Sequence, residues 1–110
     1  MDSDGIALVR RYYGTLDAGE YDELESLLAP VFVQRRPDRT FQGRDAFVRF
    51  MREERPMTDT THELDDVFGA EDRAAARGRL LDGDGDPVFA FADHFRIEDG
   101  RIVALETYTR

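Results

Sequence analysis

The chain reads VFAFADHFRIEDGRI from Val88 to Ile102, and this stretch decides the fold. Alternate residues of a strand point to opposite faces of a sheet. One face of this strand carries Phe89, Phe91, Asp93, Phe95 and Ile97. The other face carries Val88, Ala90, Ala92, His94 and Arg96. Because EDG is a typical hairpin turn, the stretch predicts a strand that is buried on one face and turns back into an antiparallel neighbour.

Asp93 is the single carboxylate in this apolar row. A bare carboxylate in such surroundings costs several kcal/mol, so it must be hydrogen-bonded, paired with a cation, or protonated through a raised pKa. Asp93 is therefore the strongest functional candidate in the chain. His94 falls on the opposite face, which predicts a surface or interface position.

The remaining pattern predicts helices first and strands after them. Residues 5–18 form an amphipathic helix that Ser3 or Asp4 can cap, and a second helix with a capping box at Asp22 and Glu25 ends at Pro30. A third helix begins at Gly43 and stops at Pro56. Strands are predicted at residues 31–36, 40–42, 60–68, 73–81, 87–97 and 101–108. This order indicates one α+β domain over residues 1–110, with the helices on one face of a curved antiparallel sheet.

Composition narrows the possible partners. The 110 residues include 24 acidic and 15 basic side chains, every basic one an arginine, for a net charge of -9. This balance argues against nucleic acid and anionic membranes as partners. The absence of cysteine excludes disulfides, thiolate metal sites and cysteine nucleophiles. No stretch resembles a membrane span or a signal peptide, so we expect a cytoplasmic protein. The surplus of acidic residues indicates a protein of a salt-rich cytoplasm. A GC-rich genome is the alternative explanation for the absence of lysine, but it does not explain the acidic surplus.

Three segments together resemble the SnoaL-like, nuclear transport factor 2-like superfamily. They are VRRYYGTLDAG at residues 9–19, FQGRDAF at residues 41–47 and DHFRIEDGRI at residues 93–102, and the resemblance spans nearly the whole chain. It implies a cone of strongly curved sheet, antiparallel or mixed, that three helices close around a pocket. The superfamily includes ketosteroid isomerases, polyketide cyclases, limonene epoxide hydrolases and scaffolds without catalytic activity.

The resemblance to ketosteroid isomerases implies roles at two positions. Tyr12 matches the tyrosine that donates a hydrogen bond to the developing oxyanion, and Asp93 matches the protonated aspartic acid beside it. The general-base aspartate of those enzymes is replaced here by Arg36, which precedes Pro37. An arginine cannot abstract a proton near neutral pH, so classical steroid isomerisation is not expected.

Strand alternation brings further candidates to the pocket. Arg36 shares a strand face with Phe32 and Gln34, and it can either pair with Asp93 or hold an anionic substrate. A solvated position at the strand end is the alternative. His62 shares a face with Leu64, which makes it the one plausible base at neutral pH on an inward face, or else a structural histidine.

Two acidic turns resemble functional sites. Asp82, Asp84 and Asp86 have the spacing of the first ligands of a calcium loop, but Pro87 stands where that loop needs glycine, which favours an ordinary hairpin loop. Asp38 can act as a displaced base near the pocket mouth, although a turn-forming role is more typical. Two separate histidines do not form a metal site, so neither metal nor cofactor is predicted.

These observations favour a cofactor-free isomerase, cyclase or hydrolase that acts on an apolar carbonyl or epoxide compound. The predicted catalytic residues are Asp93, Tyr12 and His62, and the predicted substrate-binding residues are Arg36, Gln34, Phe32, Phe91 and Phe89. The alternative is a module of the same fold that binds a ligand or dimerises without catalysis, in which Asp93 is structural. In either case we expect a small apolar ligand and a homodimer through the outer sheet face at Val88, Ala90 and Ala92.

Overall fold

The computed structural model describes residues 4–110. Within this range the strands form one six-stranded sheet in the order β2-β1-β6-β5-β4-β3. The helices are α1 (Asp4–Ala18), α2 (Tyr21–Leu27), α3 (Arg44–Arg49) and a π-helical turn (Phe50–Glu54). The strands are β1 (Leu28–Arg35), β2 (Thr40–Gln42), β3 (Thr61–Gly69), β4 (Arg73–Leu81), β5 (Pro87–Glu98) and β6 (Arg101–Thr109). The predicted α+β class is confirmed, and the sheet is mixed because β1 runs parallel to β6.

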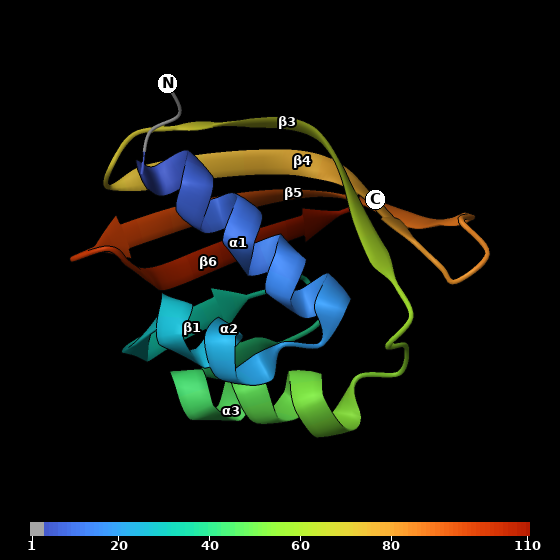
Figure 1. The fold of residues 1–110 in the computed structure, drawn as a ribbon, viewed down its shortest axis with the longest axis horizontal. Coiled ribbons are helices and arrows are strands. Elements are labelled where there is room, and N and C mark those ends of the chain that lie inside the picture. The colour runs from blue at the N-terminus through green and yellow to red at the C-terminus, as the bar shows by residue number, and fades with distance from the viewer. Residues whose placement is uncertain (1–3) are drawn as a thin grey trace.

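Helix α1 lies across the curved β3–β6 meander, while α2 and α3 lie beside β1 (Figure 1). Its apolar stripe faces the core, where Leu8, Val9, Tyr12, Tyr13 and Leu16 are all buried. The first turn of α1 packs closely against the backbone that follows β3. A Cβ on Gly5 would lie 2.0 Å from the carbonyl oxygen of Ala70, so only glycine fits there. Asp4 is in the first turn, where a negative charge stabilises the helix, and the other predicted cap, Ser3, lies outside the described residues.

The second helix is shorter than its sequence predicts. It ends at Leu27, and β1 already begins at Leu28, which pairs with Ile102 of β6. Pro30 therefore lies within β1, in an irregular part of the ladder where its missing N–H disrupts little pairing. The predicted capping box is also wrong: Glu20 is the N-cap residue without a side-chain hydrogen bond, and Asp22 pairs with Arg52 instead.

The third helix begins as predicted after Gly43, whose φ of 95° is a left-handed conformation that glycine adopts freely. Its continuation differs from the prediction, because residues 50–54 are π-helical. The backbone N–H of Arg55 donates to the carbonyl of Phe50 over 3.0 Å, and Pro56 follows. Phe47 of α3 packs against Phe32 with a ring separation of 5.0 Å and so joins this layer to the sheet.

The alternation predicted for β5 is confirmed. Phe91, Asp93, Phe95 and Ile97 are buried, whereas Ala92, His94 and Arg96 are exposed. Strand β5 pairs with β4 on one side and β6 on the other, which places its buried face at the centre of the meander under α1. No helix among residues 4–110 combines the length and apolarity needed to cross a bilayer.

Candidate functional site

A cavity of about 280 Å³ opens between α1 and the inner face of the sheet. Its apolar wall includes Leu16, Phe50, Met51 and Phe91. Its polar lining includes Tyr12 and Tyr13 of α1, Gln34 of β1 with the adjacent Arg36, Arg55 after the π-helical turn, and His62, Asp93 and Thr107 of β3, β5 and β6. The arrangement is that of a small-molecule site, an apolar hollow with a few convergent polar groups.

Asp93 lines this cavity and is only 7% exposed. Its Oδ2 accepts a hydrogen bond from the hydroxyl of Tyr13 over 2.5 Å, whereas its buried Oδ1 has no partner among the described residues. Burial raises the pKa of the Asp93 carboxyl, and the neighbouring hydroxyls of Thr107 and Tyr13, which favour its charged form, offset part of that rise. The environment therefore favours the neutral acid, which can donate a hydrogen bond.

The tyrosine that donates to Asp93 is Tyr13, and not Tyr12, which the resemblance to ketosteroid isomerases places beside it. Successive helix residues are about 100° apart, and the rotation of α1 on the sheet turns Tyr13 toward β5. Tyr12 is also buried and lines the cavity, but its ring packs between Phe95 at 5.4 Å and Phe47 at 6.4 Å. Burial raises the pKa of both tyrosines, so both hydroxyls stay protonated donors.

Of the alternatives for Arg36, the ion pair with Asp93 does not form. The Arg36 Nε donates to Asp38 over 3.1 Å and its Nη2 donates to the other carboxylate oxygen over 3.3 Å. Both residues belong to the turn around Pro37, so forming this local ion pair costs little conformational entropy. Arg36 still lines the cavity. Its charge lowers the pKa of Asp93, but this is the smallest of the effects that do so. The side chain that is hydrogen-bonded to Asp93 is therefore a tyrosine rather than an arginine.

A second contact supports Asp93 from the β6 side. Thr107 lies opposite Asp93 in the β5–β6 ladder, and its hydroxyl accepts a hydrogen bond from Gln34 Nε2 over 3.0 Å. Because that hydroxyl accepts from the amide, its own proton is available to Asp93. The Gln34 Oε1 is left buried without a partner among residues 4–110. The carbonyl oxygen of the Gln34 side chain is thus an unpaired acceptor in the same part of the structure as the Asp93 carboxyl.

His62 is held by Asp17, a contact that the sequence reasoning missed. The imidazole Nδ1 lies 2.6 Å from Asp17 Oδ1, and the backbone N–H of His62 donates to Asp17 Oδ2 over 3.0 Å. A carboxylate at Nδ1 favours the tautomer with its proton there, which leaves Nε2 with a free lone pair. The His62 ring lies 5.0 Å from the ring of Tyr13 and 5.5 Å from that of Phe91. The sequence contains one indication of this contact: Asp17 follows Tyr13 by one helical turn, so the two side chains lie on the same face of the helix.

The predicted aromatic residues divide into two groups. Phe91 and Phe89 line the cavity, with Phe89 at its edge and 37% exposed. Phe32 does not line it, because the ring is fully buried against Phe47 in the core. Val88, which was expected on the outer face, also borders the cavity at the start of β5, where the β4–β5 register shifts.

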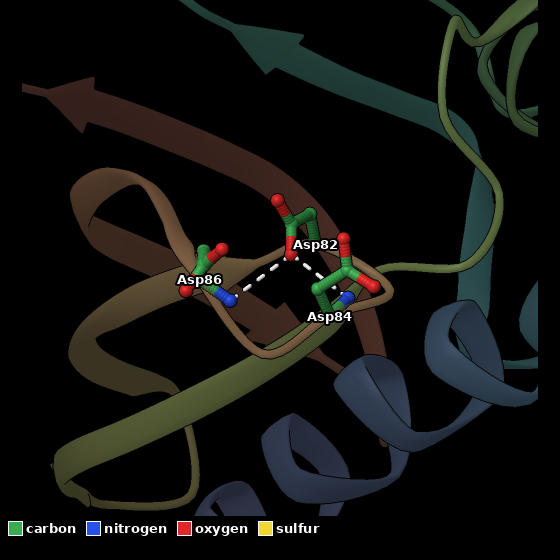
Figure 2. Close-up of side chains that lie close together, drawn as sticks. All are labelled: Asp82, Asp84 and Asp86. Atoms are coloured by element: carbon green, nitrogen blue, oxygen red, sulfur yellow. Dashed lines mark hydrogen bonds between the residues drawn. The ribbon is translucent and has the colours of Figure 1, made fainter.

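The acidic loop between β4 and β5 has a structural explanation. Asp82 Oδ1 accepts hydrogen bonds from the backbone N–H groups of Asp84 at 2.9 Å and Asp86 at 3.0 Å, and Figure 2 shows it between the two. This is the side-chain turn that Asp commonly makes. Carboxylate oxygens of all three residues lie within 4.8 Å of one another, but the loop geometry is that of a hairpin connection.

The buried Asp93 carboxyl predicts that stability falls as the pH rises. Because its pKa is raised in the folded state, the folded chain binds this proton more tightly than the unfolded chain does. Stability is then lost between the ordinary Asp pKa of about 4 and the raised value, by about 1.4 kcal/mol for each pKa unit between them. Urea unfolding of the wild type and Asp93→Asn measures this: as the pH rises through that range, the wild type is expected to lose stability relative to Asp93→Asn, in which residue 93 does not titrate. A pH-independent difference contradicts the prediction.

Comparison with known proteins identifies the family. The sequence-family model of the SnoaL-like domain matches residues 9–105. None of the curated proteins compared matches the chain. A Kribbella flavida structure whose name refers to ketosteroid isomerase aligns with a TM-score of 0.85 and 23% identity, over 97% of this chain and 78% of that one.

Two further solved structures agree with this fold. A nuclear transport factor 2-like protein of unknown function from Mesorhizobium loti has a TM-score of 0.80 and 26% identity, over 97% of this chain and 91% of that one. An epoxide hydrolase of the LEH-like type from M. tuberculosis has a TM-score of 0.82 and 16% identity, over 97% of this chain and 83% of that one. With the family match covering most of its length, the chain belongs to the family of SnoaL-like domains.

Proposed function

We propose that this domain is a cofactor-free enzyme of the isomerase, cyclase or hydrolase type that acts on an apolar carbonyl or epoxide compound. For a carbonyl substrate, its central step is proton transfer at a carbon next to the carbonyl group. One observation carries the proposal: a histidine held by a carboxylate and a buried acid held by a tyrosine line the same apolar cavity. Tyr13 is the common neighbour of both groups.

The roles follow from the protonation states. His62 is the base: its Nε2 lone pair removes the proton, and Asp17 stabilises the imidazolium that forms. Asp93, kept neutral by burial, donates a hydrogen bond to the carbonyl oxygen as it becomes an enolate. Tyr12 is a second donor in the cavity and Arg36 polarises the substrate from the rim. Phe91 and Phe89 bind the apolar part of the substrate.

The solved relatives give this proposal limited support. The names of the Kribbella flavida and M. tuberculosis proteins refer to ketosteroid isomerase and epoxide hydrolase, which are an isomerase and a hydrolase. At 23% and 16% identity these relatives speak for the fold alone. The proposal for this chain therefore rests on its own residues, above all on the two held groups.

Hydrogen–deuterium exchange tests the reaction. In D₂O, the wild type is expected to exchange the protons beside the carbonyl of 2-tetralone faster than buffer does, and Asp93→Asn is expected to lower the rate by about 100-fold. His94→Gln is the matched control, because His94 neighbours Asp93 on the exposed face. A wild-type rate equal to that of buffer would instead support the alternative, a module that binds an apolar ligand without catalysis.

Carbon NMR tests the acid directly. The Asp93 carboxyl is expected to titrate well above the ordinary value of about 4. Saturation with 2-naphthol, whose phenolic oxygen resembles an enolate oxygen, is expected to raise that pKa further. An ordinary pKa that 2-naphthol leaves unchanged would remove the role of Asp93 as a donor.

We also propose that two copies associate through the outer sheet face in a salt-rich cytoplasm. Ala90 and Ala92 border a shallow hollow on this face, and the nearby Tyr108 is exposed. The net charge of -9 fits a protein that stays soluble where salt screens its self-repulsion. Sedimentation at low and high salt tests this: a monomer under all conditions contradicts it.

A further inference from the structure

Arg55 is a cavity residue that the proposed reaction does not use. It follows the π-helical turn, where the extra residue changes the direction in which the next side chains point. Its Nη2 donates to the carbonyl of Leu16 at 3.1 Å and to the hydroxyl of Tyr21 at 2.8 Å. Its Nε is buried and has no acceptor among the described residues. The side chain is thus fixed in place while part of its hydrogen-bonding capacity is unmet.

The charge of Arg55 is also without a counterion. Among residues 4–110, no carboxylate lies within ion-pair distance of its guanidinium, whereas Arg36 has Asp38 and Arg52 has Asp22. The acceptors that Arg55 does have are neutral oxygens. Among residues 4–110 the half-buried arginines are Arg36, Arg44 and Arg55, and the first two have an acidic partner whereas Arg55 has none.

The positive charge acts on the cavity itself. Arg55 and Arg36 both line it, and their charges oppose the rise that burial causes in the pKa of Tyr12. The one carboxyl among the lining residues is Asp93, and among the described residues it forms no ion pair with Arg55. The cavity therefore presents an unneutralised cation to any molecule that enters.

We propose that the substrate is an acid whose carboxylate binds Arg55 while its reacting carbonyl group lies at Asp93. This rests on the proposed function for the position of the carbonyl group. Arg55 suits the role better than Arg36, because two hydrogen bonds to Asp38 already occupy Arg36. The fixed guanidinium binds the carboxylate with little loss of side-chain freedom. The apolar wall between the two ends accommodates a hydrocarbon body.

Binding of a matched pair of probes tests the anchor without reference to catalysis. By titration calorimetry, 2-naphthoate is expected to bind the wild type about tenfold more tightly than methyl 2-naphthoate. Arg55→Gln is expected to remove this preference and to leave the affinity for the ester unchanged, which also shows that the cavity is intact. Arg55→Lys is expected to retain part of the preference. Arg52→Gln is the matched control, because Arg52 is an exposed arginine that does not line the cavity.

Several outcomes overturn the proposal. These are equal wild-type affinities for acid and ester, binding of neither probe, an equal loss of both in Arg55→Gln, and an equal effect of Arg52→Gln. None of them bears on proton exchange at 2-tetralone, which has no carboxylate. Conversely, the proposed role of Arg55 is supported if the wild type prefers 2-naphthoate and Arg55→Gln does not, even when no proton exchange at 2-tetralone is observed. The two proposals therefore fail separately.

Discussion

Replacing His62 with glutamine is expected to slow proton exchange at 2-tetralone by about 10²–10⁴-fold, the usual contribution of a general base. Glutamine has a similar size and can still donate to Asp17, but it has no basic nitrogen to receive the proton. The loss should appear in the rate at saturating ketone rather than in its binding, because the cavity wall is preserved. Exchange followed by proton NMR at several ketone concentrations separates the two quantities.

Two variants sharpen the assignment of His62. Asp17→Asn is expected to slow exchange as well, because an amide no longer stabilises the imidazolium or fixes the Nδ1–H tautomer. His94→Gln changes the other histidine of the chain, which is exposed, and is expected to have no effect. Wild-type rates in both His62→Gln and Asp17→Asn would assign the base to another residue even if exchange itself is observed.

Replacing Phe95 with alanine is expected to lower the free energy of unfolding by about 3–5 kcal/mol. Phe95 is fully buried beneath α1, with its ring 5.4 Å from that of Tyr12 and 6.0 Å from that of Tyr13. Its removal leaves a cavity that neighbouring backbone in a paired central strand cannot fill. Urea unfolding monitored by circular dichroism measures the loss.

Phe68→Ala provides the control for this stability change. Phe68 lies on the edge strand β3 and is 61% exposed, so its truncation is expected to cost less than about 1 kcal/mol. Similar losses in the two variants would contradict the described core. A loss in Phe95→Ala that also shifts the Asp93 titration would show that this ring supports the contact between Tyr13 and Asp93.

Local patterns predicted the sheet well and the junction at Pro30 badly. From Phe91 to Ile97 the face of each residue in β5 follows from strict alternation, which depends on neighbouring residues alone. The end of α2 depends instead on a distant contact. Leu28 continues the helical stripe of Leu24 and Leu27, but its pairing with Ile102 draws it into β1. A pairing between residues so far apart in sequence cannot be read from the stripe.

The candidate site shows the same division. Asp93 could be singled out because one charge in an apolar row is an energetic anomaly visible in the sequence. Its partner could not be chosen, because Tyr12 and Tyr13 both fall within the apolar arc of the first helix and only its rotation on the sheet separates them. Arg36 and His62 were placed at the cavity, but their partners Asp38 and Asp17 depend on turn and packing geometry.

One helix sets the distance between the two held groups. Tyr13 contacts the acid and Asp17 contacts the imidazole, and these two residues are four positions apart on α1, or about 6 Å along its axis. Inserting or deleting one residue between them would rotate one group by about 100° and detach either the acid or the imidazole. The length of this segment therefore fixes which side chains of β5 and β3 the helix can hold at the same time.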